Sequence, residues 1–285
     1  MLAASLPFVF ALLWASSYIG AKVGLADVSP FAYVAIRLAI AAAIAAALIA
    51  ALGRAWPRAD RWPHLILGGA LLHGLGLSLT HAALVQVDAT PTALVHAFHP
   101  ILTAALGTML LHERFGWWQW LGVALGFAGV WIGVPAGLGT GNLILLGLSL
   151  FGLTAGTLYL KATCAAVPPF PATVVQLIGG ALAAAVLMAL LETPHLRLTA
   201  SLAGAMAWNT LMMSIVGMAI YSGMLERHGA ARASAGFFVV PGASALMAYA
   251  VLGEQVSALA IAGLAGATLG VLLVWRRDAT QNARR

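Results

Sequence analysis

Four histidines lie within long apolar stretches of the sequence, where an ionisable side chain is costly to bury. They are His73, His81, His96 and His99. Histidine titrates near neutral pH, so such residues can bind a substrate or relay protons. Alternatively, each ring satisfies only a neighbouring backbone carbonyl. His96 and His99 are three residues apart, which places them close together on one face of a helix.

The same stretches lack the patterns expected of an enzyme or a metalloprotein. Imidazole pairs suit zinc or copper, but no carboxylate accompanies these histidines within the stretches, and no His-Glu-x-x-His motif occurs. The single cysteine, Cys164, permits neither an internal disulfide nor a cysteine-based metal cluster. No nucleophile elbow is found either. The sequence therefore predicts no catalytic residue, metal or cofactor.

Aromatic and polar residues in other apolar stretches complete a predicted ligand site. Amphipathic aromatic side chains can line a pocket and offer a polar tip, although they also anchor proteins at membrane interfaces. Gln176 is included because it corresponds to Arg37 in the repeat described below. The candidate substrate-binding residues are Trp14, Ser17, Tyr18, His73, His81, His96, His99, Tyr159, Gln176 and Tyr221.

Arg37 is the only clear cation within an apolar stretch. A charge at that depth requires a partner or water. The candidate partners are Asp27, Asp88 and Glu254. Alternatively, the side chain extends to the nearby surface.

Two prolines, Pro100 and Pro241, also fall within apolar stretches. A mid-helix proline removes a backbone hydrogen bond and kinks the helix. These kinks are candidate gating hinges, and static curvature is the alternative.

Membrane-spanning helices must position these residues. The 285-residue chain is 62% hydrophobic and only 8% charged, whereas soluble domains carry about 25% charged residues. A helix needs about 20 apolar residues to cross a bilayer. Windows of that length lie near 5–24, 30–52, 62–85, 89–111, 116–134, 140–161, 170–191, 201–225, 229–252 and 257–275. An all-α integral membrane protein with ten transmembrane helices is predicted.

Basic residues between the windows predict the orientation of the helices. With a cytoplasmic N-terminus, the inner segments hold eleven basic residues, whereas the outer segments hold Lys22 and Arg197. Cytoplasmic loops carry such an excess of positive charge. We therefore expect a multi-pass membrane protein with both termini in the cytoplasm.

The two halves of the sequence resemble each other. Pairs offset by 141 residues are Pro100–Pro241, Glu113–Glu254, Gly122–Gly263 and Gly129–Gly270. Pairs offset by 139 residues are Lys22–Lys161, Pro30–Pro169 and Arg37–Gln176. Five windows per half would make the halves an inverted repeat, with a substrate site between them near the midplane. The predicted units are residues 1–137 and 138–276, followed by a cytoplasmic tail at 277–285. Duplication without transport is the alternative.

The sequence resembles EamA-type members of the drug/metabolite transporter superfamily. The resemblance is carried by the segment WASSYIGAK from Trp14 to Lys22, by Arg37, and by the two segments that run from a proline to a glutamate. Gly253-Glu254 fits the family pattern of a glycine before an acidic residue, whereas His112-Glu113 departs from it. The resemblance covers nearly the whole chain.

This resemblance implies a ten-helix bundle in the bacterial inner membrane with a central cavity. It also implies export of amino acids or related metabolites by alternating access, with the aromatic and amino-acid exporters as the most similar branch. Export of drugs or other amphipathic metabolites is an alternative, and a membrane-embedded enzyme is a more distant one. No ATP-binding motif occurs, so a secondary transporter is expected.

The expected partners are a small-molecule substrate and the lipid bilayer, without nucleic acid. Coupling to protons through the histidines is a further hypothesis. Substrate identity, transport direction, coupling ion and oligomeric state stay open at this stage.

Overall fold

Helices form nearly all of the described chain. A computed structural model describes residues 2–110, 116–224 and 239–274. The elements of the first half are α1 (Leu2–Gly24), α2 (Pro30–Ala51), η1 (Ala59–Arg61), α3 (Trp62–Gly69), η2 (Ala70–Gly76), α4 (Leu77–Leu84), α5 (Ala89–His96), α6 (His99–Leu110) and α7 (Trp117–Gly133). Those of the second half are α8 (Thr140–Cys164), α9 (Pro169–Leu191), α10 (Ala200–Ala207), η3 (Trp208–Gly217), α12 (Val240–Met247), η5 (Ala248–Leu252) and α13 (Ala258–Val274).

Seven helices of the described residues are long and apolar enough to cross a membrane. They are Leu6–Gly24, Pro30–Ala51, Ala59–Leu84, Ala89–Leu110, Thr140–Cys164, Pro169–Leu191 and Ala200–Met224. Each coincides with a predicted window. The other three windows hold shorter helices: α7, α13 and the segment Val240–Leu252. The total of ten spans and the inverted repeat stay predictions.

Proline and glycine mark the ends of the helices. α2 begins at Pro30, whose missing N–H would have had no partner in the first turn. Gly53 follows α2 with a φ of 60°, and Gly253 follows η5 with a φ of 69°. That left-handed conformation ends a helix at little cost only for glycine.

Two long helices contain π-helical segments at related positions. η2 follows α3 at Ala70, and η3 follows α10 at Trp208. The spacing of these starts is close to the 139-residue offset of the sequence repeat. π-helical turns are rare and often occur at functional sites.

The main core lies between α2, α9 and α10. Tyr33, Leu38, Val174 and Leu177 are fully or almost fully buried there. The exterior is apolar as well: Trp131 on α7 is 78% exposed, with many large apolar side chains on the other helices. An exterior of this kind suits a hydrocarbon surrounding rather than water.

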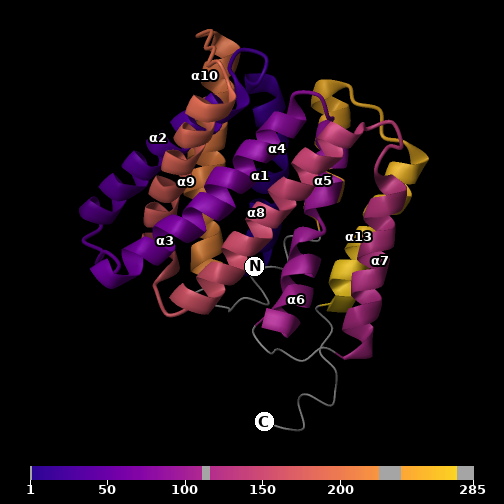
Figure 1. Cartoon of the computed structure of the whole chain (residues 1–285), viewed down its shortest axis with the longest axis horizontal. Helices are drawn as coiled ribbons and strands as arrows, with labels where there is room; N and C mark the ends of the chain where they lie inside the picture. Colours follow the sequence, from indigo (N-terminus) through magenta and orange to yellow (C-terminus); the bar gives the residue numbers. More distant parts are fainter. Residues whose placement is uncertain (1, 111–115, 225–238, 275–285) are drawn as a thin grey trace.

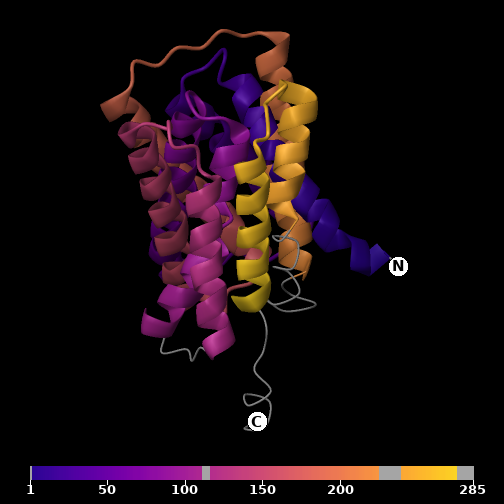
Figure 2. The ribbon, with the colours of Figure 1, turned by 90° about the vertical axis from the view of Figure 1, so that its right-hand side faces the viewer.

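The helices pack in pairs that correspond between the two halves. α1 packs against η3 and α12, while α8 packs against η2 and α6. Because α8 is the counterpart of α1 in the predicted repeat, exchanging the halves converts one set of contacts into the other. α2 packs against its own counterpart α9. Figure 2 shows most of the long helices with roughly parallel axes, while the N-terminal helix runs obliquely to them.

α7 and α13 lie side by side along one edge of the bundle (Figure 1). Glycines replace side chains between them: a Cβ on Gly270 would lie 2.6 Å from the carbonyl oxygen of Gly122, and a Cβ on Gly129 would lie 2.7 Å from that of Gly263. Small residues of this kind let membrane helices approach closely. The glycine stripes therefore join two helices of one monomer.

Candidate functional site

A cavity of about 440 Å³ lies between the helices of both halves. This volume falls in the usual range for small-molecule sites, about 300–1,000 Å³. Eight of the predicted substrate-binding residues line it: Trp14, Ser17, Tyr18, His73, His81, His96, His99 and Tyr221. Arg37 and Pro100 line it too. The structure brings these residues together, and their role in binding stays a prediction.

Two predicted substrate-binding residues are not among those lining this cavity. The Tyr159 hydroxyl instead bonds His64 Nδ1 at 2.7 Å. The backbone of Gln176 packs against Gly69, the last residue of α3, leaving no room for a Cβ there. The Gln176 side chain lies within hydrogen-bonding reach of His73, so it contacts a cavity residue without lining the cavity.

The two prolines predicted as hinges meet at one small pocket. Pro100 and Pro241 both line a space of about 20 Å³ next to the main cavity. Pro100 lies in the first turn of α6, directly after the break that separates α6 from α5. Pro241 lies in the first turn of α12. Their role in gating stays a prediction.

The sequence prediction missed several polar or flexible residues that line the cavity. They are Thr80, Thr103, Thr157, Lys161, Met213, Ser214 and Met218. Helical spacing was the available signal for α8, because Leu153, Thr157 and Lys161 recur every four residues. Tyr159 lies on another face of that helix.

His96 is bonded through both ring nitrogens. Its Nδ1 lies 3.0 Å from the Tyr18 hydroxyl, and its Nε2 lies 2.8 Å from the Ser149 hydroxyl and 3.4 Å from that of Thr80. His99 Nε2 similarly lies 3.2 Å from the Thr157 hydroxyl. Side chains from α1, α4 and α8 therefore hold His96 in place. For this residue, partners other than a backbone carbonyl satisfy the ring.

His81 combines a backbone bond with an unpaired nitrogen. Its Nδ1 donates to the Leu77 carbonyl oxygen at 2.7 Å, as the alternative interpretation of the histidines expected. Its buried Nε2 has no hydrogen-bond partner within the described part of the chain, and the same holds for His73 Nε2. Both histidines thus keep bonding capacity at a site that lines the cavity.

Arg37 is buried, with 5% of its surface exposed, so it does not extend to the surface. Its Nε donates to the Ser214 hydroxyl of η3 at 3.2 Å. The prediction that an acidic residue pairs with Arg37 is wrong for Asp27, Asp88 and Glu254. All three bond elsewhere, near the helix ends, because backbone N–H groups and other cations there compete for their carboxylates.

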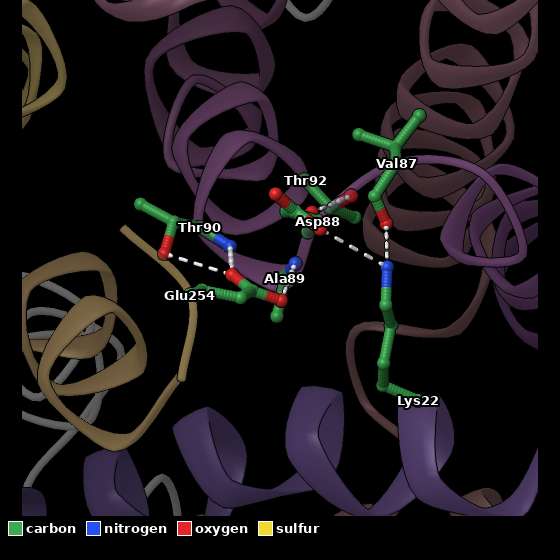
Figure 3. A network of polar contacts seen from close by, with 7 residues as sticks. All are labelled: Lys22, Val87, Asp88, Ala89, Thr90, Thr92 and Glu254. Carbon is green, nitrogen blue, oxygen red and sulfur yellow. Dashed lines mark hydrogen bonds and ion pairs between the residues drawn. The ribbon is translucent and has the colours of Figure 1, made fainter. Parts of the chain in front are cut away.

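Glu254 and Asp88 contact other residues of the chain at one end of the bundle (Figure 3). The Glu254 carboxylate accepts hydrogen bonds from the backbone N–H groups of Ala89 at 2.8 Å and Thr90 at 3.2 Å, where α5 begins. Lys22 Nζ lies 3.4 Å from the Asp88 carboxylate. Carboxylates stabilise helix N-termini, where N–H groups lack partners. Glu254 thus orders the turn that precedes α5. Its counterpart in the predicted repeat, Glu113, lies outside the described residues.

Glu192 and Asp27 form their hydrogen bonds and ion pair at the same end of the bundle. Glu192 accepts from the N–H groups of Phe31 and Ala32 at 3.2 and 2.8 Å, where α2 begins. Asp27 accepts from the Thr199 hydroxyl at 2.6 Å and pairs with Arg197 at 3.8 Å. We call this end, defined by Asp27, Asp88, Glu192 and Glu254, the loop end.

The cavity therefore contains cationic and imidazole groups but no described carboxylate. The fifth described acid, Asp60, pairs with Arg58 and Arg61 at the exposed start of the helix Ala59–Leu84. Within the described ranges, no three histidine, cysteine or acidic residues lie in a group that could hold a metal ion. The cavity can bind a ligand by charge, hydrogen bonds and aromatic contacts.

Comparisons with known proteins agree with this geometry. Residues 1–134 match the model of the EamA-like transporter family. A protein of Streptantibioticus cattleyicolor named "Probable terminal-alkyne amino-acid exporter" is 26% identical, over 93% of this chain and 90% of its own length. An uncharacterized transporter of Synechocystis sp. is 24% identical, over 93% of this chain and 87% of its own.

A solved crystal structure shares the fold. It superposes with a TM-score of 0.68 at 20% identity and covers 99% of both chains. The family match and the relatives confirm the resemblance noted in the sequence. They also favour a transport role over an enzymatic one, and the apolar helices agree with a membrane setting. The first half of the chain thus matches the EamA-like transporter family, and the apolar helices are those of a multi-pass membrane protein.

Proposed function

We propose that this transporter exports amino acids or related small metabolites across the bacterial inner membrane, and that the central cavity is its substrate site. The observation that carries the proposal is the composition of the cavity wall. Residues of the first half, including His73 and His81, face residues of the second half, including Ser214 and Tyr221. A site between two halves can open alternately to either side when one half rocks against the other.

The proposal includes ten transmembrane helices in two inverted repeats, residues 1–137 and 138–276. The exchangeable packing of α1 and α8 supports this arrangement, as does the matching position of η2 and η3. Cytoplasmic termini follow from the distribution of basic residues. The proposed cytoplasmic tail, 277–285, lies outside the described residues.

Amino acids are the proposed substrates because the cavity offers both aromatic and polar contacts. Trp14, Tyr18 and Tyr221 suit an apolar side chain, while Arg37 and the histidines suit a polar head. The name of the Streptantibioticus relative agrees with this class. Drugs or other amphipathic metabolites are the alternative, which the leucines and the two methionines of the wall would suit.

Proton coupling is a variant of the same proposal. Tyr18, His96 and Ser149 form a continuous hydrogen-bonded chain from α1 to α8. If this chain carries protons, an imposed pH gradient should drive transport, and His96→Ala should remove the response. Unchanged coupling in that variant would refute this role for His96.

Transport in proteoliposomes tests the proposed function. Vesicles containing purified protein are loaded with labelled amino acids, and efflux is compared with that of protein-free vesicles. Thr157→Trp should fill the cavity and stop the flux. Gly147→Trp is the matched control on the same helix, because nothing lies within 4 Å of a Cβ at Gly147. Folded wild-type protein that moves no amino acid of a broad panel would refute the proposal.

A further inference from the structure

Arg37 carries a positive charge that no described carboxylate compensates. Its described hydrogen bond goes to the neutral Ser214 hydroxyl at 3.2 Å. The described acidic residues are all engaged at helix ends, away from the cavity. A cation buried at membrane depth is costly unless an anion or water compensates it. A negatively charged group entering the cavity would therefore gain a strong partner.

The guanidinium group also has suitable shape for one class of anion. Its planar fork matches the two oxygens of a carboxylate and binds them through parallel hydrogen bonds. The bond from Nε to Ser214 uses one donor and fixes one edge of the group. Arg37 itself lines the cavity. These features favour a substrate carboxylate over a neutral polar group.

His81 offers the opposite bonding character in the same cavity. The Leu77 carbonyl can only accept a hydrogen bond, so His81 Nδ1, at 2.7 Å, must carry the hydrogen. In the neutral ring Nε2 is then an acceptor, a tautomer assigned from the bonding pattern. This nitrogen is buried and unpaired within the described ranges. A donor group on the substrate would satisfy it.

The donor and acceptor groups face the same cavity. His81 is 3% exposed and lines the cavity together with Arg37. Its ring lies 5.2 Å from that of Tyr33, which is one helical turn before Arg37 on α2. An α-amino acid carries its carboxylate and its ammonium group on one carbon atom. Its head therefore presents both complementary groups at short separation.

We propose that Arg37 binds the carboxylate of the substrate and that His81 Nε2 accepts a hydrogen bond from its ammonium group. The cavity then selects α-amino acids by the head that they share, and the apolar part of the cavity receives the side chain. This inference rests on the proposed function, and it assigns the two groups that would define the substrate class.

Three matched sets of ligands separate the two contacts. L-phenylalanine and L-leucine carry both groups, their amides lack the carboxylate, and 3-phenylpropionate and 4-methylpentanoate lack the ammonium group. Binding to the purified full-length protein is measured by calorimetry. The amino acids should bind at least about tenfold more tightly than either partial ligand, because each partial ligand leaves a buried group unpaired.

Variants then assign each contact to its residue. Arg37→Gln should weaken the binding of the amino acids and of the deaminated acids by about tenfold or more, and it should leave the binding of the amides unchanged. His81→Phe preserves a ring next to Tyr33. His81→Phe should lower the affinity for the amino acids to the affinity for the deaminated acids. The affinity for the deaminated acids should not fall. Arg37→Lys keeps the charge without the fork, so carboxylate binding should be intermediate.

A purely structural role for Arg37 predicts a different pattern. Ser214→Ala removes the described bond that joins Arg37 to η3. If the role of Arg37 is structural, Arg37→Gln and Ser214→Ala should each weaken the binding of all three sets of ligands equally. That result would overturn the proposal. If Arg37→Gln does not fold, the preference of Arg37→Lys for carboxylates over amides decides the question: a preference equal to that of the wild type would overturn the proposal.

The two proposals fail in distinguishable ways. Wild-type protein that transports amino acids, with Arg37→Gln discriminating among the ligands as the wild type does, refutes this inference and leaves the proposed function standing. Binding of 3-phenylpropionate that depends on Arg37, without amino-acid binding or transport, would refute the proposed function and the role of His81. It would still support the carboxylate contact.

Discussion

The charged groups at the loop end and those in the cavity use their bonding capacity differently. At the loop end, Glu192 and Glu254 each cap a helix N-terminus, and Asp27 and Asp88 each pair with a cation. In the cavity, Arg37 has a hydroxyl as its hydrogen-bond partner, and His81 has an unpaired nitrogen within the described chain.

This difference separates structural charges from charges that are available to a ligand. A carboxylate that caps a helix has its oxygens occupied, so removing it should affect folding more than transport. A buried group without a full set of partners is tolerated where a ligand completes it. Four substitutions test this contrast, and they are described from the largest expected effect to the smallest.

A carboxylate introduced into the cavity should pair with Arg37 and so remove its difference from the paired charges of the loop end. In Ser214→Asp the new carboxylate would lie where the Arg37 Nε now bonds a hydroxyl, so it would occupy the guanidinium. We expect amino-acid transport in proteoliposomes to fall about tenfold to hundredfold, as expected for loss of a bidentate pair. Ser214→Asn is the neutral control of the same shape and should lose much less. Equal losses in both variants would contradict the expectation.

His96 lines the cavity, but both of its ring nitrogens have hydrogen-bond partners, as the carboxylates of the loop end do. Tyr18→Phe would leave the buried Nδ1 of His96 unpaired. We expect the free energy of unfolding to fall by about 1–3 kcal/mol, measured by chemical unfolding in detergent. Tyr159→Phe is the control, because its bond to His64 is only partly buried and should matter less. A larger loss in the control would show that burial does not set the cost.

At the loop end, Glu254→Gln should affect stability rather than substrate choice. The amide keeps one acceptor for the N-terminus of α5 but loses the charge that favours this position. We expect a loss of about 1 kcal/mol in unfolding free energy. The preference for amino acids over their amides should not change. Glu192→Gln provides the matched change at α2, and a shifted ligand preference in either variant would contradict a structural role.

The smallest effect is expected for Asp88→Asn. The Asp88 side chain is 61% exposed and lies 3.4 Å from Lys22, which also bonds the Val87 carbonyl. Exposed ion pairs contribute about 0–1 kcal/mol and are screened by salt. We expect a change within that range that disappears at high salt in thermal unfolding. A loss as large as that of Glu254→Gln would remove the distinction between capping and surface pairing.

The sequence predicts the spans well because hydropathy is a local property. Seven predicted windows coincide with described long helices, since about 20 apolar residues fold as a helix wherever water is excluded. The break before Pro100 was also foreseeable from the missing N–H of proline. The number of spans depends on shorter helices and on chain outside the described ranges, so it stays a prediction.

The composition of the site was predictable, but its partners were not. Intramembrane histidines and Arg37 are conspicuous in any sequence, and the bond from His81 to Leu77 follows from helix geometry four residues apart. Ser214 is 177 residues from Arg37 in the sequence, so only the packing of η3 against α2 brings them together. Tyr159 was predicted to line the site, but it lies about 200° around α8 from Thr157, which does line the cavity.

The glycine contacts between α7 and α13 constrain how the protein can rearrange. Each helix fills the grooves of the other with backbone, so a slide by one residue would drive side chains into main-chain atoms. α7 belongs to the first half of the chain and α13 to the second. The two halves are thus held together along this pair of helices, and we expect any widening of the proposed passage to leave the contact between α7 and α13 unchanged.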